Sequence, residues 1–318
     1  MKYFILFFIL VFFLGCSSYQ VQKPLHHTVN CNEGVYAVKS AQCLNSKELI
    51  KNLEPYKVIF IGDHHSSKKQ HTFTSNIIRD LSKKGYRVHL ANEWFTPEDN
   101  TILAEYANGS INDANFTAKI QWEKKKGFKF DLFSPLYHAV RDTKGELYGI
   151  NLLKRERKLI SDVNKNDMSK EELYFFNNLD LDVSAHKTLL SPFFSHCHKA
   201  KNGETNAECI TRMYRVQVAW DTKMAIESAK LSNSVLNSDK DKLIVFVGAF
   251  HLEYGLGVNL RFARESNIPF ITMLPQRSNH TEVMHGEADL IYIYNKEQAA
   301  KDIEEKLIKD LREKNKNR

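Results

Sequence analysis

Two short motifs of the same form carry the side chains best suited to chemistry. Residues 62–65, GDHH, and residues 248–251, GAFH, each place a histidine three positions after a glycine. Imidazole can bind iron or another divalent metal, or hydrogen-bond a carboxylate, and its charge changes near neutral pH. The repetition predicts one shared site for His65 and His251, if the two segments meet in the fold.

The elements that must position these histidines are short strands. Each motif follows an apolar, β-branched run, 58–61 and 243–247, that is typical of a strand buried on both faces. A third run, 88–91, ends at Asn92 and Glu93. Ligands of open parallel sheets bind beyond the carboxyl ends of the strands. We therefore predict that His65, Glu93 and His251 converge at the carboxyl edge of one sheet.

The order of the remaining elements indicates the fold class. Helical patterns at 46–53, 69–84 and 257–266 alternate with the strands, and further strands are expected at 147–151 and 269–274. The segment 97–207 is mostly helical. We predict an α/β fold, a mainly parallel sheet flanked by helices, with an inserted helical lobe at roughly 97–207. The aromatic run 289–294 is expected to be a strand at the edge of the sheet.

A long helix is predicted over residues 209–230. Gln217 and Asp221 lie on one side at helical spacing, close to the arc that carries Met213, Trp220 and Met224. The two polar groups either make hydrogen bonds between helices or belong to the site. Both interpretations stay open at this point.

The chain begins with a lysine and an apolar run that ends at Gly15 and Cys16. The run is shorter than the roughly 20 residues of a membrane-spanning helix and has the form of a secretory signal. A small residue before Cys16 resembles the lipobox of bacterial lipoproteins, whose cysteine is acylated with palmitate or a similar chain. We predict a signal peptide at 1–15, lipidation of Cys16, a tether at 16–30 and a single domain at 31–318. Ser17 favours the outer membrane, and an uncleaved anchor is the alternative.

The overall charge limits the partners. The formal net charge is +7, from 45 Lys and Arg against 38 Asp and Glu, and the basic residues are scattered. Because no basic stripe alternates with aromatic residues, no nucleic acid is expected as a partner. The positive excess suits an anionic small ligand or a negatively charged membrane surface.

Four further cysteines form two pairs with the same short separation: Cys31 with Cys43, and Cys197 with Cys209. In an oxidising compartment this spacing indicates two local disulfides, although sequence alone permits three connectivities. A metal site is less favoured because no Cys-x-x-Cys pair is present.

Six separated blocks between residues 58 and 274 resemble, in order, those of the ChaN-like haem-binding lipoproteins. They are GDHH at 62–65, NEWF at 92–95, Trp122 with residues 136–137, Asn151, Gln217 with residues 221–225, and GAFHLEYGLG at 248–257. The paired motifs are also similar to the TraB/Tiki and erythromycin-esterase group, some of which are hydrolases. Asp63 departs from the family pattern, which usually has Glu. The resemblance implies haem binding outside the cytoplasm, with a role in iron acquisition or in haem storage or transfer.

For haem we expect a site built from His64, His65, Lys68, Glu93, His251 and Tyr254. The iron ligand is expected to be Tyr254, three residues beyond His251, or His251 itself, because phenolate and imidazole both bind haem iron. Lys68 and Lys69, with His64 and His71, are placed to neutralise the propionates. A homodimer closing over the haem and an outer-membrane haem receptor are the expected protein partners.

The alternative function is a divalent-metal-dependent hydrolase that uses His65, Glu93 and His251, with Asp63 as a further acid. Such an enzyme needs about three protein ligands and an open position. Serine chemistry is disfavoured because the chain has no Gly-x-Ser-x-Gly elbow. Haem binding is favoured over catalysis.

Overall fold

A computed structural model of the chain describes residues 26–29, 31, 33–194, 197, 200–201, 203–277, 282–284 and 286–295. The expected signal peptide, Cys16 and most of the tether lie outside the described residues, so these predictions stay predictions. Among the described residues, no helix combines the length and the apolar character needed to cross a membrane.

The described strands form one large sheet and one small one. The large sheet has eight strands, which in spatial order are β3 (Gln42–Leu44), β2 (Gly34–Ala37), β10 (Leu290–Tyr294), β8 (Phe270–Arg277), β4 (Val58–Asp63), β7 (Asp241–Gly248), β5 (Arg87–Asn92) and β6 (Leu147–Gly149). In the small sheet β1 (His26–Thr28) pairs antiparallel with β9 (Glu282–Met284).

The described helices all lie between β3 and β8 in the chain. They are α1 (Ser46–Leu53), α2 (Lys68–Lys83), α3 (Asn100–Ala107), α4 (Asp113–Ile120), α5 (Trp122–Lys126), α6 (Ser134–Asp142), α7 (Lys154–Asp162), α8 (Lys170–Asn177), α9 (Ser184–Phe194), α10 (Asn206–Val235) and α11 (Val258–Glu265). Short 3-10 turns are η1 (Pro97–Asp99), η2 (Phe130–Leu132), η3 (Lys165–Asp167), η4 (Ala249–His251) and η5 (Glu253–Gly255).

The large sheet is mainly parallel, which confirms the predicted fold class. The neighbours from β10 to β6 all pair in parallel, and only β2 and β3 run antiparallel to their neighbours. The prediction of an edge position for residues 289–294 is wrong. The hairpin of β2 and β3 adds two strands beyond β10, and an apolar strand pattern does not reveal which neighbours will cover it.

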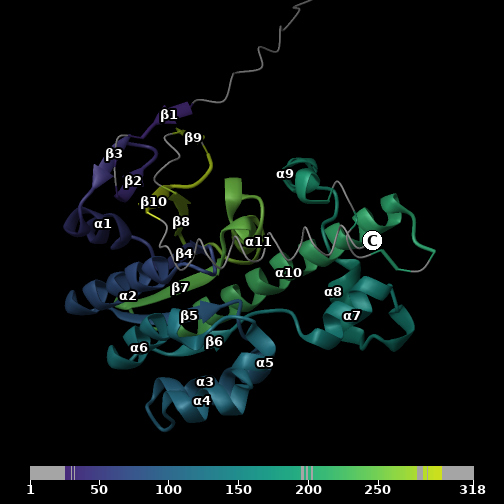
Figure 1. The fold of residues 1–318 in the computed structure, drawn as a ribbon, viewed down its shortest axis with the longest axis horizontal. Helices are drawn as coiled ribbons and strands as arrows, with labels where there is room; N and C mark the ends of the chain where they lie inside the picture. Colours follow the sequence, from purple (N-terminus) through teal and green to yellow (C-terminus); the bar gives the residue numbers. More distant parts are fainter. Residues whose placement is uncertain are drawn as a thin grey trace, which may run out of the picture.

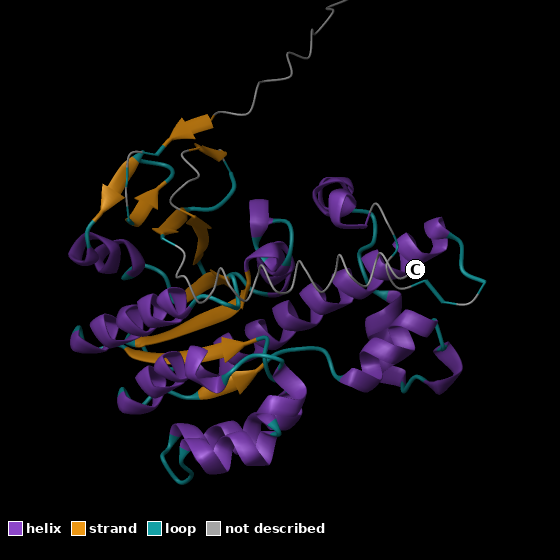
Figure 2. Ribbon diagram, in the orientation of Figure 1, coloured by secondary structure: helices purple, strands orange, loops and turns teal. Residues whose placement is uncertain are grey.

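Alternate residues of the central strands enter separate cores on the two faces of the sheet, as the two-residue period of a strand requires. Figure 2 shows helices on both sides of the strands. The first core joins Ile59, Ile61, Ile244 and Phe246 to residues of α2, α3 and α6. The second joins Val58, Phe60, Leu243, Val245 and Val247 to residues of α10 and α11. The central strands are thus buried on both faces, and their ends are held in place.

Helices gather at two places beyond the sheet. Figure 1 shows α3 and α4 beyond β6, and α7 and α8 beside the amino-terminal part of α10. The two disulfides have the predicted local pairing, Cys31 with Cys43 and Cys197 with Cys209, each across a separation of 12 residues. The second disulfide fastens the segment after α9 to the first turn of α10.

Candidate functional site

The carboxyl ends of β4, β7 and β5 are neighbours, because the strands lie side by side in that order. In the parallel register Asp63 lies beside Gly248, and Asn92 lies beside Phe246. The side chains that follow these positions therefore leave the sheet at one edge. His65 follows β4 and Glu93 follows β5.

On the β4 side, hydrogen bonds link α2, β4 and Glu93. His71 Nδ1 donates to the carbonyl oxygen of Leu132 at 2.5 Å, and His71 Nε2 donates to Asp63 Oδ1 at 3.0 Å. Asp63 Oδ2 lies 2.8 Å from His65 Nδ1, and His65 Nε2 lies 3.1 Å from Glu93 Oε1. Asp63 and His71 are buried. Acid and imidazole therefore alternate from α2 to the end of β5.

The series continues to α10 on the β7 side. Glu93 Oε2 lies 3.6 Å from His251 Nε2, and His251 Nδ1 lies 2.5 Å from Asp221 Oδ1. Asp221 is fully buried, and its Oδ1 also accepts from Gln217 Nε2 at 3.3 Å. The predicted convergence of His65, Glu93 and His251 is confirmed, and the open question about Gln217 and Asp221 is answered: both belong to this network.

These contacts shift the pKa values of the network in opposite directions. Burial opposes the charged form of His65, but hydrogen bonds to Asp63 and Glu93 outweigh it and raise the pKa of His65 to about 10. The pKa of His251 is raised by Asp221 in the same way against the effect of burial. Burial would raise the pKa of Asp63 and of Glu93, but the neighbouring histidines lower both. These contacts therefore favour the charged forms of His65, His251, Asp63 and Glu93.

Gly248 makes room for the contact between His65 and Glu93. Its backbone has an ordinary φ of −52°, so the glycine is not required by a left-handed turn. A Cβ at this position would lie 3.2 Å from His65 Cε1 and 3.4 Å from Glu93 Oε1. The sequence motif therefore has a glycine because two functional side chains approach the backbone.

Tyr254 lies in η5, just after His251, and has an unusual backbone conformation. Its φ is 55° and its ψ is 18°, in the left-handed region that bulky residues rarely adopt. The backbone N–H donates to the carbonyl oxygen of Glu287 at 3.0 Å, and the residue is 37% exposed. Within the described residues its hydroxyl has no hydrogen-bond partner. Such an outlier, which holds an aromatic side chain toward solvent, is a common feature of functional sites.

The expected propionate contacts are only partly available. Lys68 is the first residue of α2 and is exposed, with no partner in the described part of the chain. His64 Nδ1 lies 2.9 Å from the hydroxyl of Tyr294, so this ring faces β10. The prediction for His71 is wrong, because its ring is buried between Asp63 and Leu132 and cannot reach a surface ligand.

Residues 49–262 match the family model described as "Haem-binding uptake, Tiki superfamily, ChaN". This chain belongs to the ChaN family. The match covers most of the segment on which the sequence resemblance rests.

Three solved structures show similarity to this ChaN family member, and the first of them shares its fold. The structure titled "Cofacial heme binding to ChaN of Campylobacter jejuni" has a TM-score of 0.63 at 19% sequence identity, and covers 82% of this chain and 96% of that chain. The type III effector HopBA1 has a TM-score of 0.45 at 14% identity, over 79% of this chain and 93% of that chain. The erythromycin esterase EreC in its open conformation has a TM-score of 0.43 at 10% identity, over 80% and 77%. No curated protein matches the chain.

The ChaN-like blocks have clear structural roles around the site. Asn151 Nδ2 donates to the carbonyl oxygen of Glu93 at 2.6 Å and thereby fixes the end of β5. Trp94 meets the ring of His65 edge-on, with 4.8 Å between ring centroids. Trp122 and Tyr137 are buried in the aromatic core of the helical lobe, with centroids 6.3 Å apart. Phe128 of the lobe also meets the ring of His65 edge-on, with 6.2 Å between ring centroids, so the lobe borders the site.

Two residues of the site were not predicted from the sequence. His186 of α9 is buried with Nε2 3.4 Å from Asp221 Oδ2, and Arg261 of α11 places Nη1 3.9 Å from the same oxygen. Both lie on helices without a recognisable motif. Only Arg261 could have been suspected from the sequence, because this charged residue lies on the buried side of a short amphipathic helix.

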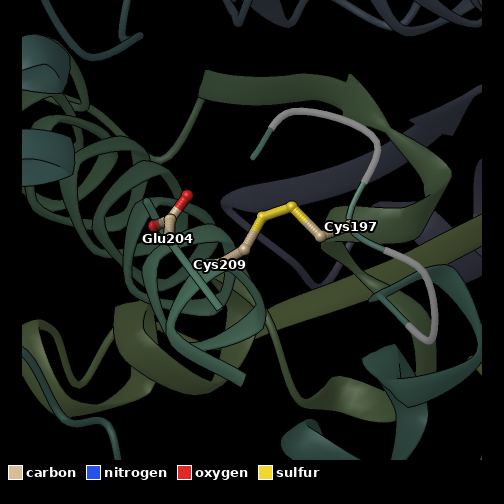
Figure 3. Close-up of side chains that lie close together, drawn as sticks. All are labelled: Cys197, Glu204 and Cys209. Carbon is tan, nitrogen blue, oxygen red and sulfur yellow. A yellow bond between two sulfur atoms is a disulfide. The ribbon is translucent and has the colours of Figure 1, made fainter. Parts of the chain in front are cut away.

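The described residues contain one group of three side chains with metal-ligand spacing, and it lies elsewhere. Cys197, Glu204 and Cys209 place their ligand atoms within 4.8 Å of one another. Figure 3 shows that the two sulfur atoms are joined by a disulfide beside the Glu204 carboxylate. Thiolates are the form of cysteine that binds metal, so this group is a structural link.

Proposed function

We propose that this protein binds haem at the carboxyl edge of its sheet, outside the cytoplasm, for iron acquisition or for haem storage or transfer. The observation that carries the proposal is membership of the haem-binding ChaN family over residues 49–262. The shared fold with ChaN of Campylobacter jejuni, whose title reports cofacial haem binding, supports it.

The chemistry of the edge fits a ferric haem. When bound, the iron accepts an electron pair from a phenolate or an imidazole. Tyr254 offers a hydroxyl oxygen that has no partner among the described residues, on an exposed side chain. His251 offers Nε2, whose nearest acidic oxygen is 3.6 Å away. His65 is less suited, because both of its ring nitrogens lie within hydrogen-bond distance of a carboxylate oxygen, at 2.8 and 3.1 Å. Tyr254 is therefore our first choice and His251 our second.

The protonation of Tyr254 predicts how the affinity for haem changes with pH. Burial raises the pKa of Tyr254, and the negative charges of Glu287 and Glu253 raise it further. At neutral pH the phenol therefore keeps its proton, which must leave Oη when the phenolate binds iron. Haem binding through Tyr254 should become tighter as the pH rises toward the pKa of the phenol.

The surroundings supply some of the other contacts that haem requires. Lys68, exposed in the first turn of α2, is available for a propionate. The side chain of His65 is 37% exposed, and Tyr254 is exposed to the same extent, so the edge is open. A flat ligand placed there keeps one face uncovered. We infer that a second copy of the chain closes over it, as a cofacial pair of haems would require.

The test is a haemin titration followed by the visible absorption spectrum. The wild type should bind haemin stoichiometrically. Tyr254→Phe removes one hydroxyl with almost no change of shape, so a phenolate ligand predicts a changed spectrum for this variant. An imidazole ligand predicts the change in His251→Ala instead.

The matched control is Tyr174→Phe, which removes the hydroxyl of a 72% exposed tyrosine on α8 and should leave the spectrum unchanged. A spectrum that moves in neither Tyr254→Phe nor His251→Ala would assign the iron to another residue. A wild type that takes up no haemin would refute the proposal.

The cellular location of the protein is a further part of the proposal. We infer that the chain is a lipoprotein acylated at Cys16, held at the outer membrane, and that it exchanges haem with an outer-membrane receptor. The support is the apolar run before Gly15 and Cys16. Cys16→Ala should move the protein from the membrane fraction to the soluble fraction. Unchanged partitioning would favour an uncleaved anchor.

A divalent-metal hydrolase is the second candidate, and one observation favours it. His65 and His251 each turn Nδ1 toward a buried carboxylate, Asp63 and Asp221, and turn Nε2 toward Glu93. Carboxylates in this position commonly orient metal-binding histidines. Stoichiometric binding of zinc or manganese that His65→Ala and His251→Ala abolish, without any uptake of haemin, would replace haem binding with this function.

A further inference from the structure

A groove with a volume of about 550 Å³ lies between α7 and the amino-terminal half of α10. Its floor is apolar and is formed by Met213, Val216 and Trp220. The spacing of three and four residues places these side chains on one face of α10. All three are only half-buried, so an apolar strip on this helix stays open to a ligand.

The rim of the groove carries cations without counterions. Lys154 and Arg157 lie in the first turn of α7, and both are exposed. Neither side chain has a hydrogen bond or ion pair within the described residues. Their neighbours do: Arg155 pairs with Glu172, and Lys158 Nζ donates to Asp162 at 2.8 Å. Lys158 and Arg212 also line the groove, but they are paired with Asp162 and Glu204, so Lys154 and Arg157 are the cations of the lining without a counterion among the described residues.

The position of these cations is electrostatically unfavourable in the absence of an anion. The first turn of a helix carries the positive end of the helix dipole, which favours acidic residues and disfavours basic ones. The N-cap of α7 is Leu153, whose side chain accepts no hydrogen bond from the first turn. The acidic residue of this first turn, Glu156, accepts from the backbone N–H of Leu153 at 2.9 Å and pairs with Lys223 at 3.2 Å, so it does not pair with Lys154 or Arg157. A phosphate is the anion best matched to such a surface.

We propose that the groove binds an anionic phospholipid of the membrane surface. Lys154 and Arg157 contact the phosphate, and one acyl chain lies along Met213, Val216 and Trp220. The positive net charge of the chain, +7, favours an anionic membrane as the source of this lipid. The site is independent of the haem proposed for Tyr254, although Trp220 also touches the other site through His251, with 6.5 Å between ring centroids.

The test uses the full chain in vesicles of neutral phosphatidylcholine. Phosphatidylglycerol with brominated acyl chains is added in steps, and tryptophan emission is recorded. Bromine quenches only tryptophans that it touches, and the difference from Trp220→Phe isolates the signal of Trp220 from those of Trp94 and Trp122. The emission of Trp220 should be quenched by brominated phosphatidylglycerol and much less by brominated phosphatidylcholine.

The cations are tested with the double variant Lys154→Gln/Arg157→Gln. Two cations near an anionic surface together correspond to about a thirtyfold change in apparent affinity. The lipid fraction that gives half-maximal quenching should rise by about that factor. The matched control is Lys47→Gln/Lys51→Gln, which removes two exposed charges from α1, at the opposite end of the molecule from α7, and should leave the quenching unchanged (Figure 1).

Three results would overturn the assignment. Equal quenching by the neutral brominated lipid would show that the groove is an apolar surface that does not select an anionic headgroup. If the titration of Lys154→Gln/Arg157→Gln matches that of the wild type, the two cations do not contribute to lipid binding. Displacement of the lipid by an equimolar amount of oleate would assign the groove to a free fatty acid. None of these results would affect haemin binding, which is measured by its own spectrum.

Discussion

At the scale of single residues, His65 has the most constrained role. Its Nδ1 lies 2.8 Å from Asp63 Oδ2 and its Nε2 lies 3.1 Å from Glu93 Oε1. Each ring nitrogen needs a proton to satisfy its carboxylate, and an imidazolium has no lone pair for iron. His65 therefore compensates two acids at the sheet edge. In the haem site that we propose, Tyr254 and His251 are the candidate iron ligands, and His251 must first lose the proton on Nε2.

The raised pKa of His65 makes the stability of the fold depend on pH. The folded protein holds this proton up to about pH 10, whereas a histidine in an unfolded chain has a pKa of about 6.5. The contribution of His65 is therefore complete below about pH 6.5 and is lost as the pH rises to about 10. The free energy of unfolding in urea should fall across this window in the wild type and fall less steeply in His65→Gln.

The acidic side of the same pair behaves in the opposite sense. The pKa of Asp63 is lower in the folded protein than its value of about 3.9 in an unfolded chain. The Asp63 carboxylate therefore stabilises the fold above about pH 3.9, and this contribution is lost only in acid. The control for the alkaline window is Thr101→Ser, which changes an exposed residue that carries no titratable group. The slope of this control should match that of the wild type. Equal slopes for His65→Gln and the wild type would contradict the argument.

At the scale of elements, the strand ends were predictable and their surroundings were not. Unbroken β-branched runs identify β4 and β7, and parallel pairing brings the residues after them together, so His65, Glu93 and His251 could be placed from the sequence. The position of β10 could not, because the hairpin of β2 and β3 that covers it is distant in the chain. His186 also escaped prediction, since its contact with Asp221 depends on how α9 packs on α10.

The amino-terminal end of β7 shows how a polar side chain can hold an element in place. Lys242 is buried, and its Nζ donates to the carbonyl oxygens of Leu53, Glu54 and Tyr56 at 3.3, 2.8 and 2.7 Å. The first two belong to the end of α1, where carbonyls lack partners within the helix. Burial lowers the pKa of this lysine to about 8. Lys242 therefore fastens α1 to the central strand.

Lys242→Met should destabilise the protein by about 2 kcal/mol, because carbonyl groups lose a buried donor. Urea unfolding monitored by circular dichroism measures this difference. The control is Lys51→Met, an exposed lysine on α1 itself, which should change the free energy of unfolding by less than about 0.5 kcal/mol. A Lys242→Met variant as stable as Lys51→Met would show that water replaces the ammonium group at no cost.

At the scale of the whole molecule, the network at the sheet edge joins the ends of β4, β5 and β7 to α10, and the side chain of His65 is 37% exposed there. The fold provides a rigid platform in which buried charges fix His65 and His251. In the haem site that we propose, one chain covers one face of the haem. A second copy would supply the other side, so haem binding and dimerisation should occur together.

The most direct test of haem binding is sedimentation velocity of the purified chain with haemin, recorded at the visible absorption of the haem and at the protein absorption. We predict that both signals sediment together at the rate of a dimer, with one haem per chain, and that the protein without haemin sediments as a monomer. Visible absorption that stays with free haemin, while the protein sediments unchanged, would contradict the account.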